Sequence, residues 1–198
     1  MPVQSDLQVI SGRLERGEID GAQYLEQLMR FVAAQIGCAR AGLRVFVDTA
    51  EGRALRCVAM YDAAADRMVT ATDILQAGGT AYFERLQRDG SVIAARDDAI
   101  SVGPLREYFD ASKVASSMDM GFWVNGVRFG RFSCEQRGTP AAWTQRQLQS
   151  LRKISSRASL TLMHVVTAAI DTAPGALWET STPNRLATMS MPLDPPDE

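Results

Sequence analysis

Cys134 lies in the segment FSCEQRGTPAAWTQRQL beside Glu135, and a cysteine with charged neighbours raises the possibility of a thiol active site. Thiol catalysis needs a thiolate, and therefore a base or a positive charge that lowers the pKa of the thiol. Strand alternation places Arg131 on the face opposite Cys134, and a close Glu135 would raise that pKa. The only histidine, His164, is distant in sequence. Because free cysteines are usually buried, we expect Cys134 to be structural.

The cysteine and histidine content also argues against a metal centre. Cys38, Cys57 and Cys134 are widely spaced, and no CxxC pair occurs. A structural zinc site needs about four nitrogen or sulfur ligands at recognisable spacings. We therefore expect free thiols, no metal and no other cofactor.

The composition is that of an ordinary globular chain. Of 198 residues, 46% are hydrophobic and 22% are charged, which is enough apolar material for one core. The net charge of −2 offers no basic face for nucleic acid. No apolar run approaches the roughly 18 residues that span a bilayer, and the N-terminus lacks the apolar segment of a secretory signal. We expect a cytoplasmic protein that binds neither nucleic acid nor membrane.

Helices and strands must position these candidate residues. At the start of the chain, the spacing of apolar residues is that of helices. A first helix is expected over about 6–15 and a second over about 21–36. Asp20 can cap the second helix with Gln23 as its capping-box partner, and Gly37 ends it.

A long final helix is expected from Thr144, which can cap it, to about residue 170, with Trp143 anchoring its start against the sheet. The residues after it are dominated by Pro, Ser, Thr and Asp and show no periodicity. We divide the chain into an N-terminal helical extension, one domain and a flexible tail: 1–19, 20–171 and 172–198.

Between the terminal helices the pattern is mainly one of strands. Strands and short helices are expected in the order strand, strand, strand, helix, strand, helix, at 42–49, 54–62, 68–74, 80–87, 91–95 and 103–112, with Pro104 in the first turn of the last helix. The clearest local signal is Asn125-Gly126, which favours the tight turn of a hairpin. The strand before this turn has two faces: Met118, Met120, Phe122 and Val124 on one, and Asp119, Gly121 and Trp123 on the other. This order, without regular strand–helix–strand alternation, predicts an α+β fold.

Four segments together resemble a GAF domain: CVAMYD, AYFERLQRDGSVIAARDDAISVGPLREYF, SSMDMGFWVNGVRFGRFSCEQRG and WTQRQLQSL. The resemblance covers about Tyr24 to Leu162 and is to bacterial sensor-type GAF domains found beside histidine kinases and diguanylate cyclases. It implies a central antiparallel sheet with the N- and C-terminal helices on one face, and with short helices and loops over a pocket on the other. The sequence departs from the family pattern at Thr80, Met118, Gly121 and Gln136, around the ligand-facing side.

The resemblance implies a small-molecule pocket, and aromatic walls with a few polar groups are what such sites use. Asp119 is the most informative residue because a carboxylate in a central strand needs a partner, and we expect Arg56, Arg44 or a pocket. Several of the aromatic residues would serve equally well as core. The expected ligand-binding residues are Arg56, Tyr61, Tyr82, Phe83, Phe109, Ser117, Asp119, Trp123 and Phe132.

Three functions remain open. The first is a non-catalytic sensory or regulatory module that binds a small molecule or a protein partner and signals through its terminal helices. The second is a thiol enzyme similar to free methionine sulfoxide reductases, in which Cys57 and Cys134 would meet across the sheet. The third is a dimerisation module with a filled cavity. A phytochrome-like role would need a histidine beside a bilin-bearing cysteine, and His164 lies deep in the final helix.

The final helix carries an apolar and small-residue stripe at alternating spacings of three and four. This stripe predicts either a helical homodimer, as the resemblance implies, or packing on the domain's own sheet. Its members are Leu148, Leu151, Ser155, Ala158, Leu162, Val165 and Ala169.

Overall fold

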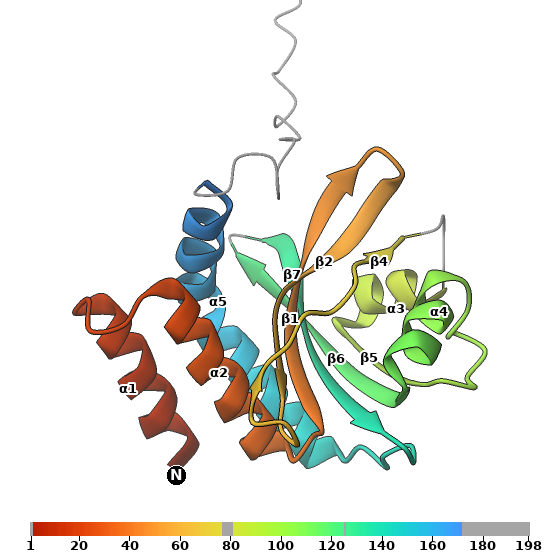
Figure 1. The fold of residues 1–198 in the computed structure, drawn as a ribbon, viewed down its shortest axis with the longest axis horizontal. Coiled ribbons are helices and arrows are strands. Elements are labelled where there is room, and N and C mark those ends of the chain that lie inside the picture. The colour runs from red at the N-terminus through yellow and green to blue at the C-terminus, as the bar shows by residue number, and fades with distance from the viewer. Residues whose placement is uncertain (1, 77–80, 125, 172–198) are drawn as a thin grey trace, which may run out of the picture.

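The computed structural model describes residues 2–76, 81–124 and 126–171, and within them the chain folds around one antiparallel sheet (Figure 1). The strand order is β3-β2-β1-β7-β6-β5, and β4 pairs with β2 off this path. The strands are β1 (Arg40–Thr49), β2 (Gly52–Asp62), β3 (Arg67–Met68), β4 (Ile74–Leu75), β5 (Ser91–Ala95), β6 (Val114–Val124) and β7 (Val127–Arg137).

Helices cover both faces of the sheet. Figure 1 shows the N- and C-terminal helices together on one side and the two short helices on the other. The first group is α1 (Pro2–Glu15), α2 (Gly21–Ile36) and α5 (Gln145–Asp171), and the second is α3 (Ala81–Asp89) and α4 (Pro104–Ser112). The predicted α+β architecture is confirmed. Residues 172–198, expected to be a flexible tail, lie outside the described residues.

The helix boundaries follow local signals in the sequence. Asp20 accepts a hydrogen bond from the Gln23 backbone while the Gln23 side chain accepts one from the Asp20 backbone, which is the predicted capping box. Gly37 ends α2 in the left-handed conformation, with φ of 74°. Thr144 and Gln147 form the same reciprocal pair at the start of α5. The first helix begins at Pro2, four residues before its expected start.

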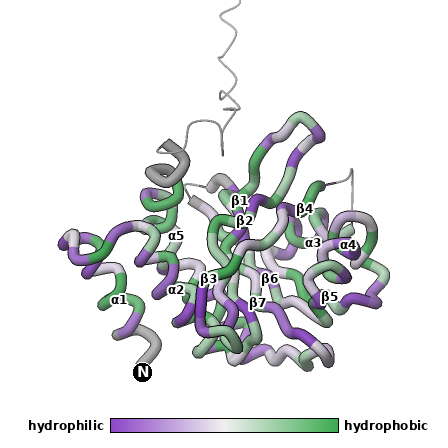
Figure 2. The backbone as a smooth tube through the Cα atoms, viewed as in Figure 1, coloured by the Kyte–Doolittle hydropathy of each residue, from purple (hydrophilic) through white to green (hydrophobic). Residues whose placement is uncertain are grey.

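Two hydrophobic cores lie on the two faces of the sheet. The three-helix core joins the sheet to α1, α2 and α5, and the two-helix core joins it to α3 and α4. Hydrophobic and hydrophilic residues alternate in short blocks along α1, α2 and α5 (Figure 2), as expected of helices with one buried side. Of the predicted stripe on α5, the three-helix core contains Leu151, Ala158, Leu162 and Val165. That stripe therefore packs on the domain's own sheet.

The segment after β2 differs from its prediction as a continuous strand over 68–74. Only its two ends pair with β2, as β3 and β4. Between them the Thr72 carbonyl accepts a hydrogen bond from Arg44, and the Asp73 carboxylate accepts one from the Cys57 backbone. These two hydrogen bonds, one with β1 and one with β2, take the place of the backbone hydrogen bonds that a third long strand would form.

The β6–β7 hairpin closes tightly, with Val124 opposite Val127 and Gly126 at φ of 77°. Asn125 lies outside the described residues. The predicted separation of faces is confirmed as far as Phe122, because Met118, Met120 and Phe122 belong to the three-helix core. In the part of the chain that the structure describes, no helix is both long enough and apolar enough to cross a membrane.

Candidate functional site

The sheet face under α3 and α4 carries a patch of buried polar side chains. Every member is at most 4% exposed, although three are arginines and two are carboxylates. We call this patch the polar grid: Arg40, Arg44, Ser117, Asp119, Arg131, Ser133 and Glu135. The registers of β1, β7 and β6 arrange it in three rows, which are Arg40, Glu135 and Ser117; Gly42, Ser133 and Asp119; and Arg44, Arg131 and Gly121.

Asp119 is the centre of one half of the polar grid. Its Oδ2 lies 2.7 Å from Arg131 Nη1 and accepts hydrogen bonds from Tyr82 Oη at 2.9 Å and Ser117 Oγ at 2.8 Å. Arg131 also donates to Tyr82 Oη. The carboxylate therefore has the partner that a buried charge requires. That partner is Arg131, and the expected pairing with Arg56 or Arg44 is wrong.

Glu135 is the centre of the other half. Its Oε2 lies 2.6 Å from Arg40 Nη2, and its Oε1 accepts hydrogen bonds from Tyr108 Oη at 2.7 Å and Ser133 Oγ at 3.4 Å. Tyr82 comes from α3 and Tyr108 from α4. One hydrogen bond from a tyrosine to a carboxylate thus joins each covering helix to the sheet.

The tyrosines must stay neutral to make these contacts. Burial, and then the charge of Glu135, raise the pKa of Tyr108 to about 12. Burial and the charge of Asp119 raise the pKa of Tyr82 well above its ordinary value, although Arg131 opposes them. Both hydroxyls therefore act as hydrogen-bond donors, and neither is poised to act as a base near neutral pH.

Arg44 carries the charge that the two carboxylates do not balance. Its guanidinium is fully buried, lies 4.5 Å from the centre of the Tyr108 ring, and donates from Nη1 to the Thr72 carbonyl at 2.7 Å. Its Nε and Nη2 find no hydrogen-bond partner among the described residues. Arg131 lies directly opposite it in the β1–β7 register, and like charges so placed repel. The polar grid therefore holds three guanidinium groups and two carboxylates.

The structure brings together five of the nine predicted ligand-binding residues. The two-helix core and the polar grid beneath it contain Tyr82, Phe83, Phe109, Ser117 and Asp119.

The other four lie elsewhere. Tyr61 and Phe132 belong to the three-helix core on the opposite face, and Arg56 pairs with Asp73 at 3.0 Å. Trp123 lines a separate cleft.

Sequence reasoning missed Arg40, Arg131, Ser133, Glu135 and Tyr108 as members of the site, and it named Arg44 only as a possible partner of Asp119. Arg131, Ser133 and Glu135 alternate with the apolar residues of β7, so their shared face was readable from the sequence. The alternation alone predicts that this polar face is exposed, since an alternating strand normally turns its polar side to water. Only the GAF resemblance implied that short helices cover it.

The cysteines do not form a thiol site. Cys134 is fully buried in the three-helix core, whereas Cys57 lies opposite Arg44 in the β1–β2 register, on the face of the polar grid. The meeting of these two residues across the sheet, which the thiol-enzyme alternative requires, is therefore blocked by the sheet itself. Burial raises the pKa of the Cys57 thiol despite Arg44, and burial and contact with Cys38 raise that of Cys134 well above its ordinary value. Both shifts oppose thiolate formation.

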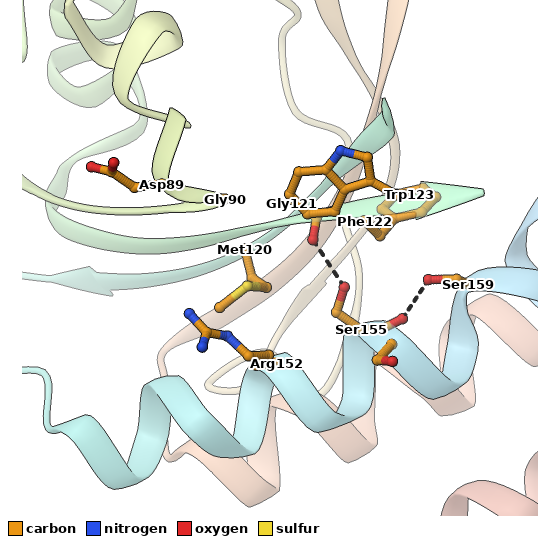
Figure 3. A pocket seen from close by; sticks show the side chains of 10 residues that line it. Asp89, Gly90, Met120, Gly121, Phe122, Trp123, Arg152, Ser155 and Ser159 are labelled. Atoms are coloured by element: carbon orange, nitrogen blue, oxygen red, sulfur yellow. Dashed lines mark hydrogen bonds between the residues drawn. The ribbon is translucent and has the colours of Figure 1, made fainter. Parts of the chain in front are cut away.

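A cleft of about 460 Å³ lies between α5 and the end of β6 (Figure 3). The Trp123 indole forms one wall, and it fits because Gly90 and Gly121 lack side chains. Cβ atoms at these two positions would lie 3.0 and 2.8 Å from Trp123 Cη2. Ser155 Oγ donates to the Gly121 carbonyl at 3.1 Å and so holds α5 against the strand. The charged lining residues Asp89 and Arg152 are exposed, so this cleft shows less of a built site than the polar grid.

Comparison with solved structures identifies the fold. The chain is similar to the photosensory core module of the Stigmatella aurantiaca phytochrome, with a TM-score of 0.58 and 17% identity over 86% of this chain. It spans 38% of that protein's length. It is also similar to a phycoerythrobilin-bound GAF domain of a cyanobacterial phytochrome, with a TM-score of 0.62, 14% identity, and coverage of 85% of this chain and 98% of that one.

A third similar structure is the GAF domain of a two-component sensor histidine kinase from Bacillus halodurans, with a TM-score of 0.52 and 12% identity. That match covers 71% of this chain and 95% of the other. No family model matches the sequence. No curated protein matches it either. The chain is thus an α+β domain with helices on both faces of an antiparallel sheet, and its fold is the GAF fold that the sequence resemblance predicted.

Proposed function

We propose that this chain is a non-catalytic sensory or regulatory module whose ligand is a small anionic molecule, bound between the sheet and the helices α3 and α4. The observation that carries this proposal is Arg44. A fully buried guanidinium with two unused donor atoms is costly to maintain, and an anion would supply both the charge and the acceptors.

The contacts of the polar grid suggest how such a ligand would be sensed. The Tyr108 ring of α4 lies over Arg44, and the Thr72 carbonyl before β4 accepts a hydrogen bond from it. An anion that bound Nε and Nη2 would compete with the Tyr108 ring and the Thr72 carbonyl for the Arg44 guanidinium. It would therefore shift α4 and the segment that leads to β4. The tyrosine–carboxylate bonds would transmit that shift to the sheet.

The module would act in the cytoplasm and pass its signal to a partner, as a homodimer through its terminal helices or through a signalling protein. The stripe on α5 is used within the domain, so a dimer would use other faces of α1 and α5. Val9 and Leu160 are candidates, because they are large apolar residues that are 56% and 63% exposed.

The alternatives have less support. The thiol-reductase hypothesis needs two cysteines at one open site, whereas Cys57 and Cys134 lie on opposite faces of the sheet. A bilin is bound by the cyanobacterial relative, but in this chain the single histidine, His164, is exposed on α5 and far from the polar grid in the fold. A dimerisation module without a ligand would give no reason for a buried arginine whose Nε and Nη2 have no partner among the described residues.

Native mass spectrometry of the purified protein, compared with the denatured chain, tests the proposal. We expect a reproducible additional mass that disappears in Arg44→Met. Arg106→Met removes an exposed arginine of α4 and is the matched control, which should keep the additional mass. If neither protein carries an additional mass, and a panel of small organic acids and phosphates gives no thermal shift that depends on Arg44, the ligand hypothesis is wrong.

A further inference from the structure

A hollow of about 260 Å³ opens between the β1–β2 hairpin, the β6–β7 hairpin and α3. Two of its residues are arginines and three are aromatic, so its lining is basic and aromatic at once. The lining residues that matter here are Arg53, Arg128, Phe46, Phe83, Trp123 and Gln87. Phe83 belongs to the two-helix core and Phe46 packs against that core, so these rings separate the hollow from the polar grid.

Arg53 and Arg128 bring two like charges to this one hollow. Asp48 lies opposite Arg53 in the strand register, at the exposed end of the hairpin. Burial, and then the charge of Arg53, lower the pKa of Arg128. The two guanidiniums therefore repel each other, and an anion between them would relieve that repulsion.

The arginines are held in place by their neighbours. Arg53 lies 4.7 Å from the centre of the Phe46 ring, and Arg128 lies 5.2 Å from the centre of the Trp123 ring. Arg128 Nη2 donates to the Gln87 carbonyl at 2.7 Å, while its buried Nε has no partner among the described residues. These contacts use only part of the five N–H donors of each guanidinium. Arginines positioned in advance lose less conformational freedom when they bind a ligand.

We propose that this hollow is a second binding site, for the phosphate group of a small phosphorylated molecule. Planar guanidinium forks match the tetrahedral oxygens of phosphate and can bind them in a bidentate manner. The volume lies just below the usual range for small-molecule pockets, which suits a phosphate or diphosphate group better than a large organic ligand. Trp123, which is 37% exposed, offers an indole against which a base attached to the phosphate could stack.

This site goes beyond the proposed function of the polar grid and does not depend on it. The anion would link three parts of the chain that are distant in sequence, namely Arg53 near the first hairpin, Arg128 after the second, and Gln87 in α3. Its occupancy would restrain the end of the domain where these segments meet.

The test is titration of the full chain with orthophosphate, pyrophosphate and ADP, followed by calorimetry and tryptophan fluorescence. We expect saturable binding of one anion per chain with a dissociation constant on the order of 1 mM or tighter, and a fluorescence change that is lost in Trp123→Phe. Each of Arg53→Gln and Arg128→Gln should weaken binding about tenfold, as expected for one charge-assisted contact. Arg67→Gln together with Arg146→Gln removes two exposed arginines elsewhere, and this control should bind normally.

Arg53 is exposed, so its single variant should fold even if Arg128→Gln does not. Binding that is equal in all variants, or no saturable binding of any of the three anions, overturns the proposal. Tighter binding of ADP than of pyrophosphate identifies a nucleotide as the natural class, and equal binding identifies the phosphate group alone. Either result supports the site, provided that the loss follows Arg53 and Arg128.

Discussion

Arg44 and Arg131 are directly opposite each other in the β1–β7 register, but their replacement by methionine should have opposite effects on stability. Arg131→Met leaves Asp119 buried without its ion pair, which costs about 3–5 kcal/mol. Arg44→Met removes a guanidinium that forms no direct ion pair among the described residues, so the free energy of unfolding should stay equal or rise. Denaturant unfolding of both variants measures this difference.

The comparison distinguishes a ligand site from a structural network, because a purely structural Arg44 should be as costly to remove as Arg131. Arg131→Met and Arg44→Met remove the same atoms from adjacent strands, so each is the control for the other. A loss of several kcal/mol in Arg44→Met would contradict the view that Arg44 awaits a ligand.

Tyr108 predicts how stability depends on alkaline pH. Its pKa rises from an ordinary value of 10.0 in the unfolded chain to about 12 in the folded protein, so between these values the folded state holds a proton that the unfolded state has lost. Its contribution is therefore complete below about pH 10 and is lost as the pH rises through about 12.

Tyr108→Phe should be less stable at neutral pH, since Glu135 loses a hydrogen bond, but it should lose stability more slowly above pH 10. The difference in slope should approach about 1.4 kcal/mol per pH unit. Denaturant titrations of both proteins across this range measure it. Equal slopes would mean that Tyr108 does not titrate in this network.

At the scale of helices and strands, the signals that worked were local. The capping box of Asp20 and Gln23, the terminating Gly37 and the Thr144 cap each depend on residues within one turn, so their helix ends were predictable. The loss of the third long strand was not predictable, because it depends on contacts of Thr72 and Asp73 with residues that precede them by many positions.

Gly130 and Gly121 test how closely the central strands pack. A Cβ atom on Gly130 would lie 2.1 Å from the Arg44 carbonyl oxygen and 3.0 Å from Val45 Cα, so β1 and β7 would have to separate. A Cβ atom on Gly121 would meet only the far edge of the Trp123 ring and the Gly90 carbonyl, at 2.8 and 3.4 Å. A half-exposed indole can move aside, but a paired backbone cannot.

Gly130→Ala should therefore cost about 3 kcal/mol or more, at the upper end of overpacking effects, and Gly121→Ala about 1 kcal/mol. Thermal unfolding of the two variants provides the measurement. Tryptophan fluorescence should change in Gly121→Ala because Trp123 is displaced from its place against the strand. A Gly130→Ala protein of normal stability would show that the β1–β7 contact is looser than the geometry indicates.

For the whole molecule, the sequence predicted the sheet, the order of its elements and which helices share a face. It did not predict the polar grid, because Arg40, Arg44, Arg131 and Glu135 come from two strands some ninety residues apart and become neighbours only through the β1–β7 pairing. The predicted aromatic residues Tyr82, Phe83 and Phe109 were easier to find, since they lie on short amphipathic helices.

Association of the whole molecule should depend on the outer faces of α1 and α5, since the inner stripe of α5 is occupied by the sheet. Leu160, at 63% exposed, is the most exposed large apolar residue described, and it lies on α5 beside the groove formed with α1 at Arg157 and Thr161. If the protein is a dimer through its terminal helices, Leu160→Glu should weaken the dimer at least tenfold, because two like charges would then be placed at the interface. Native mass spectrometry across a dilution series measures this change.

Val102→Glu, at a residue that is 48% exposed in the connection before α4, adds the same charge away from both terminal helices and should leave association unchanged. If the two variants behave alike, the terminal helices are not the interface, and a signal from the polar grid would have to leave through α3 and α4 instead.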